Sequence, residues 1–205
     1  LVLGKEGGTL KLPDGSSSTQ NFGDKSVLEE VVLPETITSI PNYSFNGYSN
    51  LNKCNIPNSV TTIGWLAFAF CTSLEYDELV LENVTTLGYQ AFHNVKIRKI
   101  VMPKLTGCPQ NGNESEANYG LKTYLEEVII GPDLASIGFR SFIHYTALKY
   151  IVIQAVTPPT LGNYAFENTN NCPSYVPDSS VTAYREASGW VNYADRIKPL
   201  SEYTE

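Results

Sequence analysis

The chain has no excess of basic residues. Its 205 residues include 14 Lys and Arg against 21 Asp and Glu, a formal net charge of −7. Non-specific binding to DNA or RNA requires clustered cations that neutralise phosphates, so we expect no nucleic-acid partner. The sequence also lacks a polybasic run that would bind anionic lipid. It has no apolar run of about eighteen residues, and we therefore expect no membrane span.

Motifs for metal and nucleotide binding are missing as well. The four cysteines (Cys54, Cys71, Cys108 and Cys172) form no CxxC pair and have no histidine at ligand spacing, so no metal site is expected. Buried free thiols are favoured over a single disulfide. The glycine-rich stretches 4–8 and 111–112 lack the residue order of a phosphate-binding loop, so no cofactor is expected.

What the sequence does contain is a repeat. An apolar anchor returns at intervals of 23, 23, 23, 28 and 23 residues. The anchors are Leu28, Leu51, Leu74, Ile97, Leu125 and Leu148. Each unit except the one that begins at Ile97 also has an Ile or Leu followed five residues later by a Phe. These pairs are Ile40/Phe45, Ile63/Phe68, Leu87/Phe92, Ile137/Phe142 and Leu161/Phe166. A period of 20 to 29 residues is typical of leucine-rich repeats.

Each unit predicts two short strands. It opens with an L-x-x-V-x-L pattern, as at 28–33, whose alternation indicates a strand. A proline such as Pro34 ends this strand, and a short β-branched step follows. Glycines at 64, 88, 138 and 162 then permit a turn into a helical or 3₁₀ turn that points the Phe inward. One unit cannot bury its own apolar face, so stacked units share a continuous core.

The repeats at 28–153 have irregular segments on both sides. Residues 1–27 are rich in Gly, Ser, Asp and Asn and suit an N-terminal cap or a linker. Residues 148–200 comprise the last repeat and a C-terminal cap. In this cap we expect a strand at 175–177 and a helix at 181–188, with Asp178 or Ser179 as its N-cap and Trp190 over the end of the core. Residues 201–205 are expected to be disordered.

The unit that begins at Ile97 departs from the pattern. It is five residues longer than its neighbours, and a polar stretch at 106–120 replaces the Ile/Phe pair. We expect Tyr119 to stand where the other units have Phe. Loops on a rigid scaffold often carry function. A decayed repeat without a role is the alternative interpretation.

The units resemble the BspA-type leucine-rich repeats of bacteria. The similarity lies in IPNSVTTIGWLAFAFCTSL at 56–74 and LPETITSIPNYSFNGYSNL at 33–51, and residues 157–200 resemble the terminal unit of that family. The resemblance implies a single-domain α/β repeat solenoid, right-handed and curved, with short parallel strands joined by turns or short helices. It also implies a non-enzymatic binding or adhesion module that is exported to the cell surface and recognises a protein or glycan. Because the only methionine is Met102, we expect that an initiator end and any export signal preceded Leu1.

Strand alternation predicts two rows of outward-pointing side chains. The candidate binding row consists of Glu30, Lys53, Tyr76, Lys99, Glu127 and Tyr150. The second row consists of Val32, Asn55, Glu78, Val101, Ile129 and Val152. The third unit holds an extra residue, so its members Tyr76 and Glu78 can shift by one position. As a binding strip, the first row offers Tyr76 and Tyr150 as amphipathic anchors. The alternative is a purely structural row, since cross-strand pairs stabilise a sheet by about 0.2–1 kcal/mol each without a ligand.

Two other function classes are weighed against the binding module. One is a structural spacer that presents another domain, and the other is a carbohydrate-active protein. Glycoside hydrolysis needs two carboxyl groups across a cleft, whereas alternation is expected to place Glu126 and Glu127 on opposite faces. His93 and His144 have no nucleophile motif and are interpreted as surface or packing residues. No catalytic residue is therefore predicted, and the oligomeric state is left open.

Overall fold

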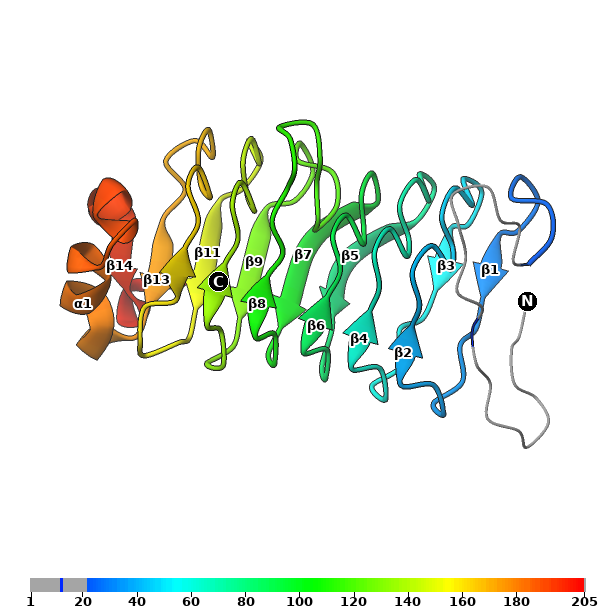
Figure 1. Cartoon of the computed structure of the whole chain (residues 1–205), viewed down its shortest axis with the longest axis horizontal. Coiled ribbons are helices and arrows are strands. Elements are labelled where there is room, and N and C mark those ends of the chain that lie inside the picture. The colour runs from blue at the N-terminus through cyan, green and yellow to red at the C-terminus, as the bar shows by residue number, and fades with distance from the viewer. Residues whose placement is uncertain (1–11, 13–21, 205) are drawn as a thin grey trace.

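The computed structural model describes Leu12 and residues 22–204, which form one elongated coil of parallel strands (Figure 1). The strands of the first wall of the coil are β1 (Glu30–Val31), β3 (Lys53–Cys54), β5 (Glu75–Val80), β7 (Lys96–Met102), β9 (Glu127–Ile130), β11 (Tyr150–Ile153), β13 (Ser174–Val176) and β14 (Ile197–Pro199). The short strands are β2 (Ser39–Ile40), β4 (Thr62–Ile63), β6 (Thr86–Leu87), β8 (Gly107–Cys108), β10 (Ser136–Ile137) and β12 (Thr160–Leu161). The predicted repeat solenoid is confirmed.

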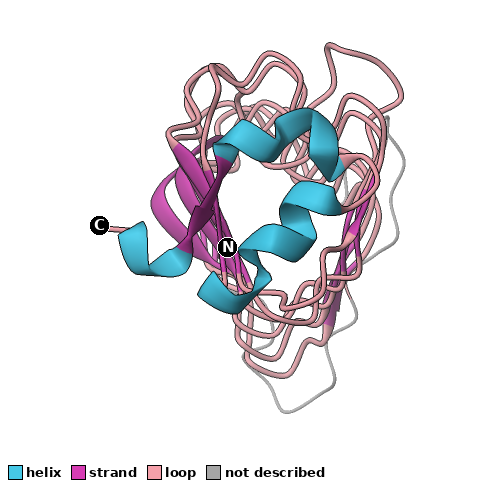
Figure 2. Ribbon diagram, turned by 90° about the vertical axis from the view of Figure 1, so that its left-hand side faces the viewer, coloured by secondary structure: helices cyan, strands magenta, loops and turns pink. Residues whose placement is uncertain are grey.

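The two kinds of strand form opposite walls of the coil (Figure 2). One wall contains a six-stranded sheet of order β14-β13-β11-β9-β7-β5, beside which β1 and β3 make a separate pair. The other wall contains two three-stranded sheets, β2-β4-β6 and β8-β10-β12. Apolar side chains such as Val31, Ile100 and Val128 point between the walls and are fully buried.

Stacked aromatic rings fill the interior between the walls. Phe45 lies 5.2 Å from Phe68, and Phe68 lies 5.3 Å from Phe92, between ring centroids. Tyr119 continues the stack in the irregular unit, where it lies 4.6 Å from Phe142 and is fully buried. The predictions that each Phe points inward and that Tyr119 takes the place of Phe are thus confirmed.

The segments that lead into each Phe are turns, and the expected helical or 3₁₀ turn is absent from them. The residue two positions before each Phe has a left-handed backbone, with φ between 50° and 59°. These residues are Tyr43, Leu66, Gln90, Arg140 and Tyr164. Such a conformation costs about 1–3 kcal/mol for a non-glycine residue. Bonds between neighbouring turns offset that cost, as in the 2.8 Å bond from the Phe68 N–H to the Ala91 carbonyl.

A glycine precedes four of these turns, and Pro41 precedes the turn at Tyr43. The glycines are required for close packing rather than for a positive φ. At Gly64, an added Cβ would lie 2.5 Å from the Asn42 backbone nitrogen and 2.7 Å from the Pro41 carbonyl carbon. No side chain fits at such distances, because adjacent turns stack through their backbones. The predicted glycine positions are therefore correct, but the physical reason is the stacking.

A cap closes the C-terminal end of the coil. It consists of η1 (Asp178–Ser180), α1 (Val181–Glu186), η2 (Trp190–Arg196) and η3 (Leu200–Glu202), and Figure 2 shows helices across the end of the ring. The buried Trp190 donates its indole N–H to the Pro159 carbonyl at 2.8 Å. The expected N-cap at Asp178 or Ser179 is wrong. These residues belong to η1, and Ser180 precedes α1 without a capping side-chain bond.

Residues 201–204 are ordered, contrary to the expected disorder of the tail. After β14 pairs with β13, η3 lies on the outer side of the sheet (Figure 2). Tyr203 then packs against Tyr150 and Tyr175, with centroid distances of 5.0 and 5.4 Å. Residue 205 and most of the predicted N-terminal segment 1–27 lie outside the described residues. Within that segment, Phe22 stacks on Phe45 at 5.1 Å.

The irregular unit separates the two sheets of short strands. At the regular junctions, the residue after a short strand donates its N–H to the preceding unit, as Gly88 does to the Ile63 carbonyl at 2.7 Å. The corresponding donor for the Leu87 carbonyl would be residue 109, which is a proline and has no N–H. The ladder therefore stops between β6 and β8, while β5, β7 and β9 remain paired on the opposite wall.

Candidate functional site

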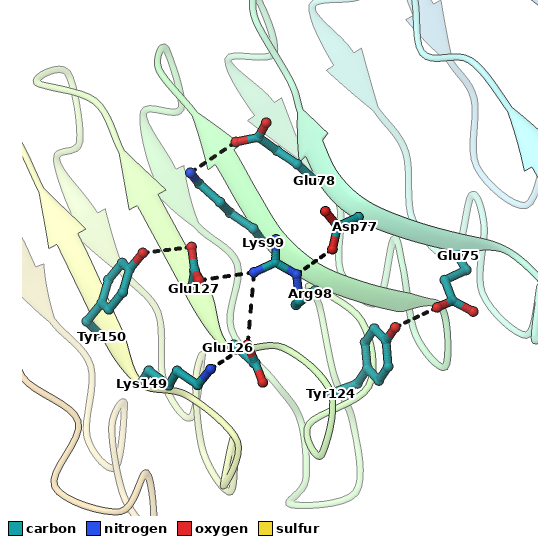
Figure 3. Close-up of polar contacts among 10 residues, drawn as sticks. All are labelled: Glu75, Asp77, Glu78, Arg98, Lys99, Tyr124, Glu126, Glu127, Lys149 and Tyr150. Atoms are coloured by element: carbon teal, nitrogen blue, oxygen red, sulfur yellow. Dashed lines mark hydrogen bonds and ion pairs between the residues drawn. The ribbon is translucent and has the colours of Figure 1, made fainter. Parts of the chain in front are cut away.

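The outer face of β5, β7, β9 and β11 gathers eight polar side chains in two rows, which we call the charged strip (Figure 3). The strip consists of Asp77, Glu78, Arg98, Lys99, Glu126, Glu127, Lys149 and Tyr150. Backbone register aligns Glu78 with Lys99, Lys99 with Glu127, and Glu127 with Tyr150. In the adjacent row, acidic and basic residues alternate from Asp77 to Lys149.

Arg98 is the centre of the charged strip. Its guanidinium pairs with Asp77, lies 3.1 Å from the Glu127 carboxylate and lies 4.0 Å from that of Glu126. A hydrogen bond from Arg98 is the main cause that lowers the pKa of Asp77. The same bond raises the pKa of the guanidinium itself, so Arg98 stays charged throughout the accessible pH range. Three carboxylates thus share one cation.

The other charges of the strip are also paired. The Lys99 ammonium lies 3.1 Å from Glu78, and the Lys149 ammonium lies 2.8 Å from Glu126. At the edge of the strip, Tyr124 donates a 2.6 Å hydrogen bond to Glu75, which lowers the pKa of that carboxyl group. The strip is therefore a pre-organised network.

The strip encloses a shallow hollow of about 210 Å³ between β5 and β11. It is lined by six of the strip residues, all except Glu126 and Lys149. Tyr150 forms one edge, where its hydroxyl donates a 2.7 Å hydrogen bond to Glu127 and accepts one from Tyr203. Burial and the Glu127 carboxylate raise the pKa of Tyr150, so its hydroxyl remains protonated.

Most of the predicted binding row lies on this face, but Tyr76 does not. Glu30 and Lys53 are aligned and form an ion pair of 2.9 Å, and Lys99, Glu127 and Tyr150 are aligned as predicted. The register places Tyr76 opposite the inward-pointing Ile97.

The third unit holds extra residues between its anchor Leu74 and the inward-pointing Leu79, which pairs with Ile100. These residues explain the error. Tyr76 packs partly buried against the core, and its hydroxyl donates a 2.7 Å bond to the Cys54 carbonyl, where the sheet is interrupted. Glu78 is predicted in the second row, but the structure places it in the first row, in the outward position beside Lys99.

The second predicted row is corrected in the same way. Val101 is aligned with Val80 rather than Glu78, and it continues through Ile129, Val152 and Tyr175. Asn55 is used within the fold, since its side chain bonds both the N–H and the carbonyl of Leu33 at 2.6 and 2.9 Å. Val32 is 38% exposed, whereas Val152 is buried.

Sequence reasoning missed the row that contains Asp77, Arg98, Glu126 and Lys149. Strict alternation along a strand assigns the residues of this row to the inner face. It therefore predicts that Glu126 and Glu127 lie on opposite faces of the sheet. In the structure both carboxylates face Arg98, because Glu126 precedes β9 and does not follow its alternation. The signal in the sequence was the alternation of charge sign along this row.

A second hollow lies where the short-strand wall is interrupted. It has a volume of about 560 Å³, and its walls include Trp65, Leu87, Tyr89, Pro109 and Gln110. Trp65 is 59% exposed. The buried Asn118 holds this region together, since its side chain accepts the Gln90 N–H at 2.8 Å and donates to the Pro109 carbonyl at 2.9 Å. We call this hollow the junction pocket.

The polar stretch 106–120 is tied to the neighbouring units rather than projecting freely. Glu114 pairs with His144 at 3.2 Å and with Arg140 at 3.5 Å, and its carbonyl accepts a 2.6 Å bond from Lys122. Burial lowers the pKa of Lys122 to about 8. His93 accepts the Ala117 N–H at 3.2 Å, and burial lowers its pKa. Both histidines thus anchor this stretch, as predicted for packing residues.

The cysteines and the remaining polar groups show no metal centre. All four cysteines are free and buried. Within residues 22–204 and Leu12, no three His, Cys, Asp or Glu side chains converge as metal ligands. Across the same part of the chain, no helix combines the length and the hydropathy needed to cross a bilayer.

The stacked strand-and-turn units, with an inward apolar ladder, define a leucine-rich-repeat solenoid. The model of the BspA-type leucine-rich repeat region matches residues 10–111 and 114–188 in six copies, and the chain belongs to this family. No curated protein matches the sequence significantly.

The solved structures that are similar to the chain include the following three. A leucine-rich repeat protein of Treponema pallidum is 22% identical with a TM-score of 0.55, over 89% of this chain and 86% of that protein. One from Bacteroides ovatus is 20% identical with a TM-score of 0.46, over 75% and 40%. A leucine-rich cell surface protein of Faecalibacterium prausnitzii is 18% identical with a TM-score of 0.31, over 75% and 55%. The chain thus spans less than two thirds of the last two proteins.

Proposed function

We propose that the protein is a non-enzymatic recognition module that binds a protein ligand on the charged strip, displayed outside the cell. Membership of a repeat family whose members serve as interaction and surface modules supports the general role. The observation that carries the specific proposal is the hollow beside Arg98. At about 210 Å³ it is smaller than the roughly 300–1,000 Å³ of small-molecule sites. It suits a single side chain of a partner protein.

The charges of the strip favour specificity over non-specific adhesion. Its acidic and basic groups are already oriented by one another, so little side-chain entropy is lost when a partner with the complementary pattern docks. The chain as a whole carries a net charge of −7, which attracts a partner with a basic surface over longer range.

A hydrolytic role for Glu126 and Glu127 has less support. The Arg98 guanidinium faces both carboxylates, and Glu127 also accepts a hydrogen bond from the Tyr150 hydroxyl. A glycoside hydrolase needs one carboxyl group kept protonated and a substrate cleft between the pair. Two carboxylates bridged by a cation provide neither feature.

The test is an array of extracellular-matrix and cell-surface proteins, printed beside glycans and probed with the purified chain. Glu78→Lys reverses a charge at the hollow, and Glu82→Lys makes the same change in the turn after β5. We expect Glu78→Lys to weaken binding to a protein ligand about tenfold, or roughly 1.4 kcal/mol, and Glu82→Lys to leave it unchanged. Equal affinity of both variants, or silence across all printed proteins, contradicts the proposal, and silence favours a structural spacer.

Display outside the cell has its own test. Intact cells of the source organism are treated with a protease or with an antibody against the chain. Digestion or labelling without lysis is the expected result, and protection until lysis would place the protein inside.

A further inference from the structure

We propose that the junction pocket binds a neutral oligosaccharide. This site lies between the two short-strand sheets, on the wall of the coil opposite to the charged strip (Figures 1 and 2). It therefore goes beyond the protein-binding role proposed above and does not depend on it.

The pocket has the size and the walls of a ligand site. Its volume of about 560 Å³ falls within the range of roughly 300–1,000 Å³ for small-ligand pockets. Trp65 and Tyr89 come from equivalent positions of adjacent units, each directly after the close-packed glycine of its turn, and both line the pocket. An exposed Trp together with a Tyr provides apolar ring faces that carry polar edges. Such surfaces suit the C–H faces of a sugar ring.

The polar groups of the pocket favour a ligand rich in hydroxyl groups. Thr86 and Gln110 also line it, so a hydroxyl and a side-chain amide are available. The Leu87 carbonyl faces the next unit at this point and receives no ladder bond, because residue 109 is proline. A backbone carbonyl without a ladder partner can accept a hydrogen bond from a ligand. A sugar hydroxyl both donates and accepts, so it can bond this carbonyl and the amide.

The charge of the pocket argues for a neutral sugar. The lining residues include no Asp, Glu, Lys, Arg or His. The nearby Glu116 carboxylate already accepts hydrogen bonds from the backbone N–H groups of Gly112 and Asn113. An anionic sugar would find no cation there. A proline-rich peptide also docks on aromatic side chains, but it offers few donors for the Leu87 carbonyl, since proline has no N–H.

The location of the pocket follows from one sequence event. Pro109 stops the ladder. The chain still bonds to the following turn through the Asn111 N–H, and Asn118 then bonds to Pro109 and Gln90. In the regular units, neighbouring turns pack too closely for even a Cβ, as at Gly64. The irregular unit is thus the place where the short-strand wall opens, and the inserted residues form one side of the opening.

The experiment titrates the full chain with cellotriose, N-acetylchitotriose and mannotriose, with sialyllactose and a proline-rich decapeptide as competing ligand classes. Trp190 is fully buried and Trp65 is 59% exposed, so a ligand in the pocket changes the emission of Trp65. A Trp65→Phe variant supplies the Trp190 background. Calorimetry measures the sugar affinity of Trp65→Ala, Gln110→Ala and a control, Tyr164→Ala. The control removes a 51% exposed aromatic ring that lies outside the junction pocket.

We expect at least one neutral trisaccharide to bind at millimolar concentration or below and to quench Trp65. Trp65→Ala and Gln110→Ala should weaken this binding at least about tenfold, and Tyr164→Ala should leave it unchanged. Absence of binding by all three neutral sugars, binding that survives Trp65→Ala, or binding only of sialyllactose or the peptide would overturn the assignment. Glu78→Lys is expected to leave sugar binding intact, so this site and the charged strip can fail separately.

Discussion

Tyr203 donates a hydrogen bond to the Tyr150 hydroxyl at 3.1 Å, with the two rings at an interplanar angle of 67°. The end of the chain thereby covers one edge of the charged strip. The Tyr150 hydroxyl in turn reaches Glu127, so the tail is connected through two hydrogen bonds to the carboxylates around Arg98. Order in residues 201–204 has a physical cause in these contacts.

Loss of the Tyr203 ring should therefore destabilise the C-terminal end. We expect Tyr203→Ala to lower the free energy of unfolding by about 1–1.5 kcal/mol, from two aromatic contacts. Tyr203→Phe keeps the rings and loses only the hydroxyl, at a cost of about 0.5 kcal/mol. Urea denaturation followed by circular dichroism measures both. An alanine variant as stable as the wild type would mean that the tail contact contributes nothing in solution.

Arg98 should contribute more to stability than an isolated surface cation. We expect Arg98→Met to lower the free energy of unfolding at neutral pH by more than Lys53→Met does, because three carboxylates lose their shared partner. Lys53→Met breaks one pair with a 73% exposed lysine and should cost about 0.3 kcal/mol or less.

The effect of Arg98 should depend on pH. The folded-state pKa of Asp77 is lowered from its ordinary value of 3.8. Its contribution is therefore present above that pH and is lost as the carboxylate becomes protonated below it. Urea midpoints measured from neutral pH down to about pH 3 should show the difference between wild type and Arg98→Met shrinking. A difference that grew on acidification would exclude this explanation.

Gly138→Ala should be strongly destabilising although Gly138 has no positive φ. An added Cβ would lie 2.6 Å from the Gln110 backbone nitrogen and 2.9 Å from the Cys108 carbonyl oxygen. We expect a loss of about 3 kcal/mol from overpacking between stacked turns. Gly107→Ala is the control. Its nearest atom is the Ser136 hydroxyl at 2.9 Å, which can rotate away, so thermal unfolding should show a much smaller shift for this variant.

The four thiols should be inert in the folded protein. Burial raises the pKa of Cys71, Cys108 and Cys172 to about 12 and also raises that of Cys54. Iodoacetamide at pH 8 should label none of them until denaturant is added, as read by mass spectrometry, while an exposed Ser73→Cys control reacts at once.

The raised thiol pKa values also predict how the stability of the folded protein changes with pH. Below the ordinary thiol pKa of 9.0 the free energy of unfolding does not depend on these thiols' ionisation. It declines as the pH rises above that value, because the thiols ionise in the unfolded chain while the buried ones do not. Rapid native labelling of Cys71 or Cys108 would contradict the burial.

Tyr76 should behave as a structural residue. Tyr76→Phe loses the bond to the Cys54 carbonyl and should cost about 1 kcal/mol, with no loss of affinity for a protein that binds the charged strip. Tyr150 lies at the edge of the hollow and is proposed to belong to the binding surface. Tyr150→Phe should therefore weaken binding of that protein. If Tyr76→Phe weakened binding while stability stayed constant, the residue would belong to the binding surface after all.

The sequence predicted the regular parts of this fold because each unit repeats the same physical requirement. Phe45, Phe68 and Phe142 recur at fixed offsets since each fills the same space between two walls. Tyr119 could be assigned even inside the insertion, because an aromatic ring is needed at that level of the stack. Trp190 was predicted as the end of the core for a similar reason.

The candidate site was only partly predictable because it depends on register. Extra residues at the start of β5 move Tyr76 inward and bring Glu78 beside Lys99. No local sequence pattern shows where within a strand such extra residues are accommodated. Strict alternation also hid Arg98 and Glu126, whose side chains reach the same face from positions that alternation assigns to the other. The junction pocket depends on a missing N–H at Pro109, which becomes meaningful only when the neighbouring turn is in view.

The interruption between β6 and β8 also gives the coil direction-dependent stiffness. On one wall, β5, β7 and β9 are joined by continuous hydrogen bonds, whereas on the other wall the ladder ends at Leu87. Bending that opens the short-strand wall at this level breaks few hydrogen bonds. Bending that opens the opposite wall must break the hydrogen bonds between the strands of a continuous sheet. Bending at this level is thus expected to open the short-strand wall at Pro109, with Arg98 on the opposite, continuous wall close to the pivot.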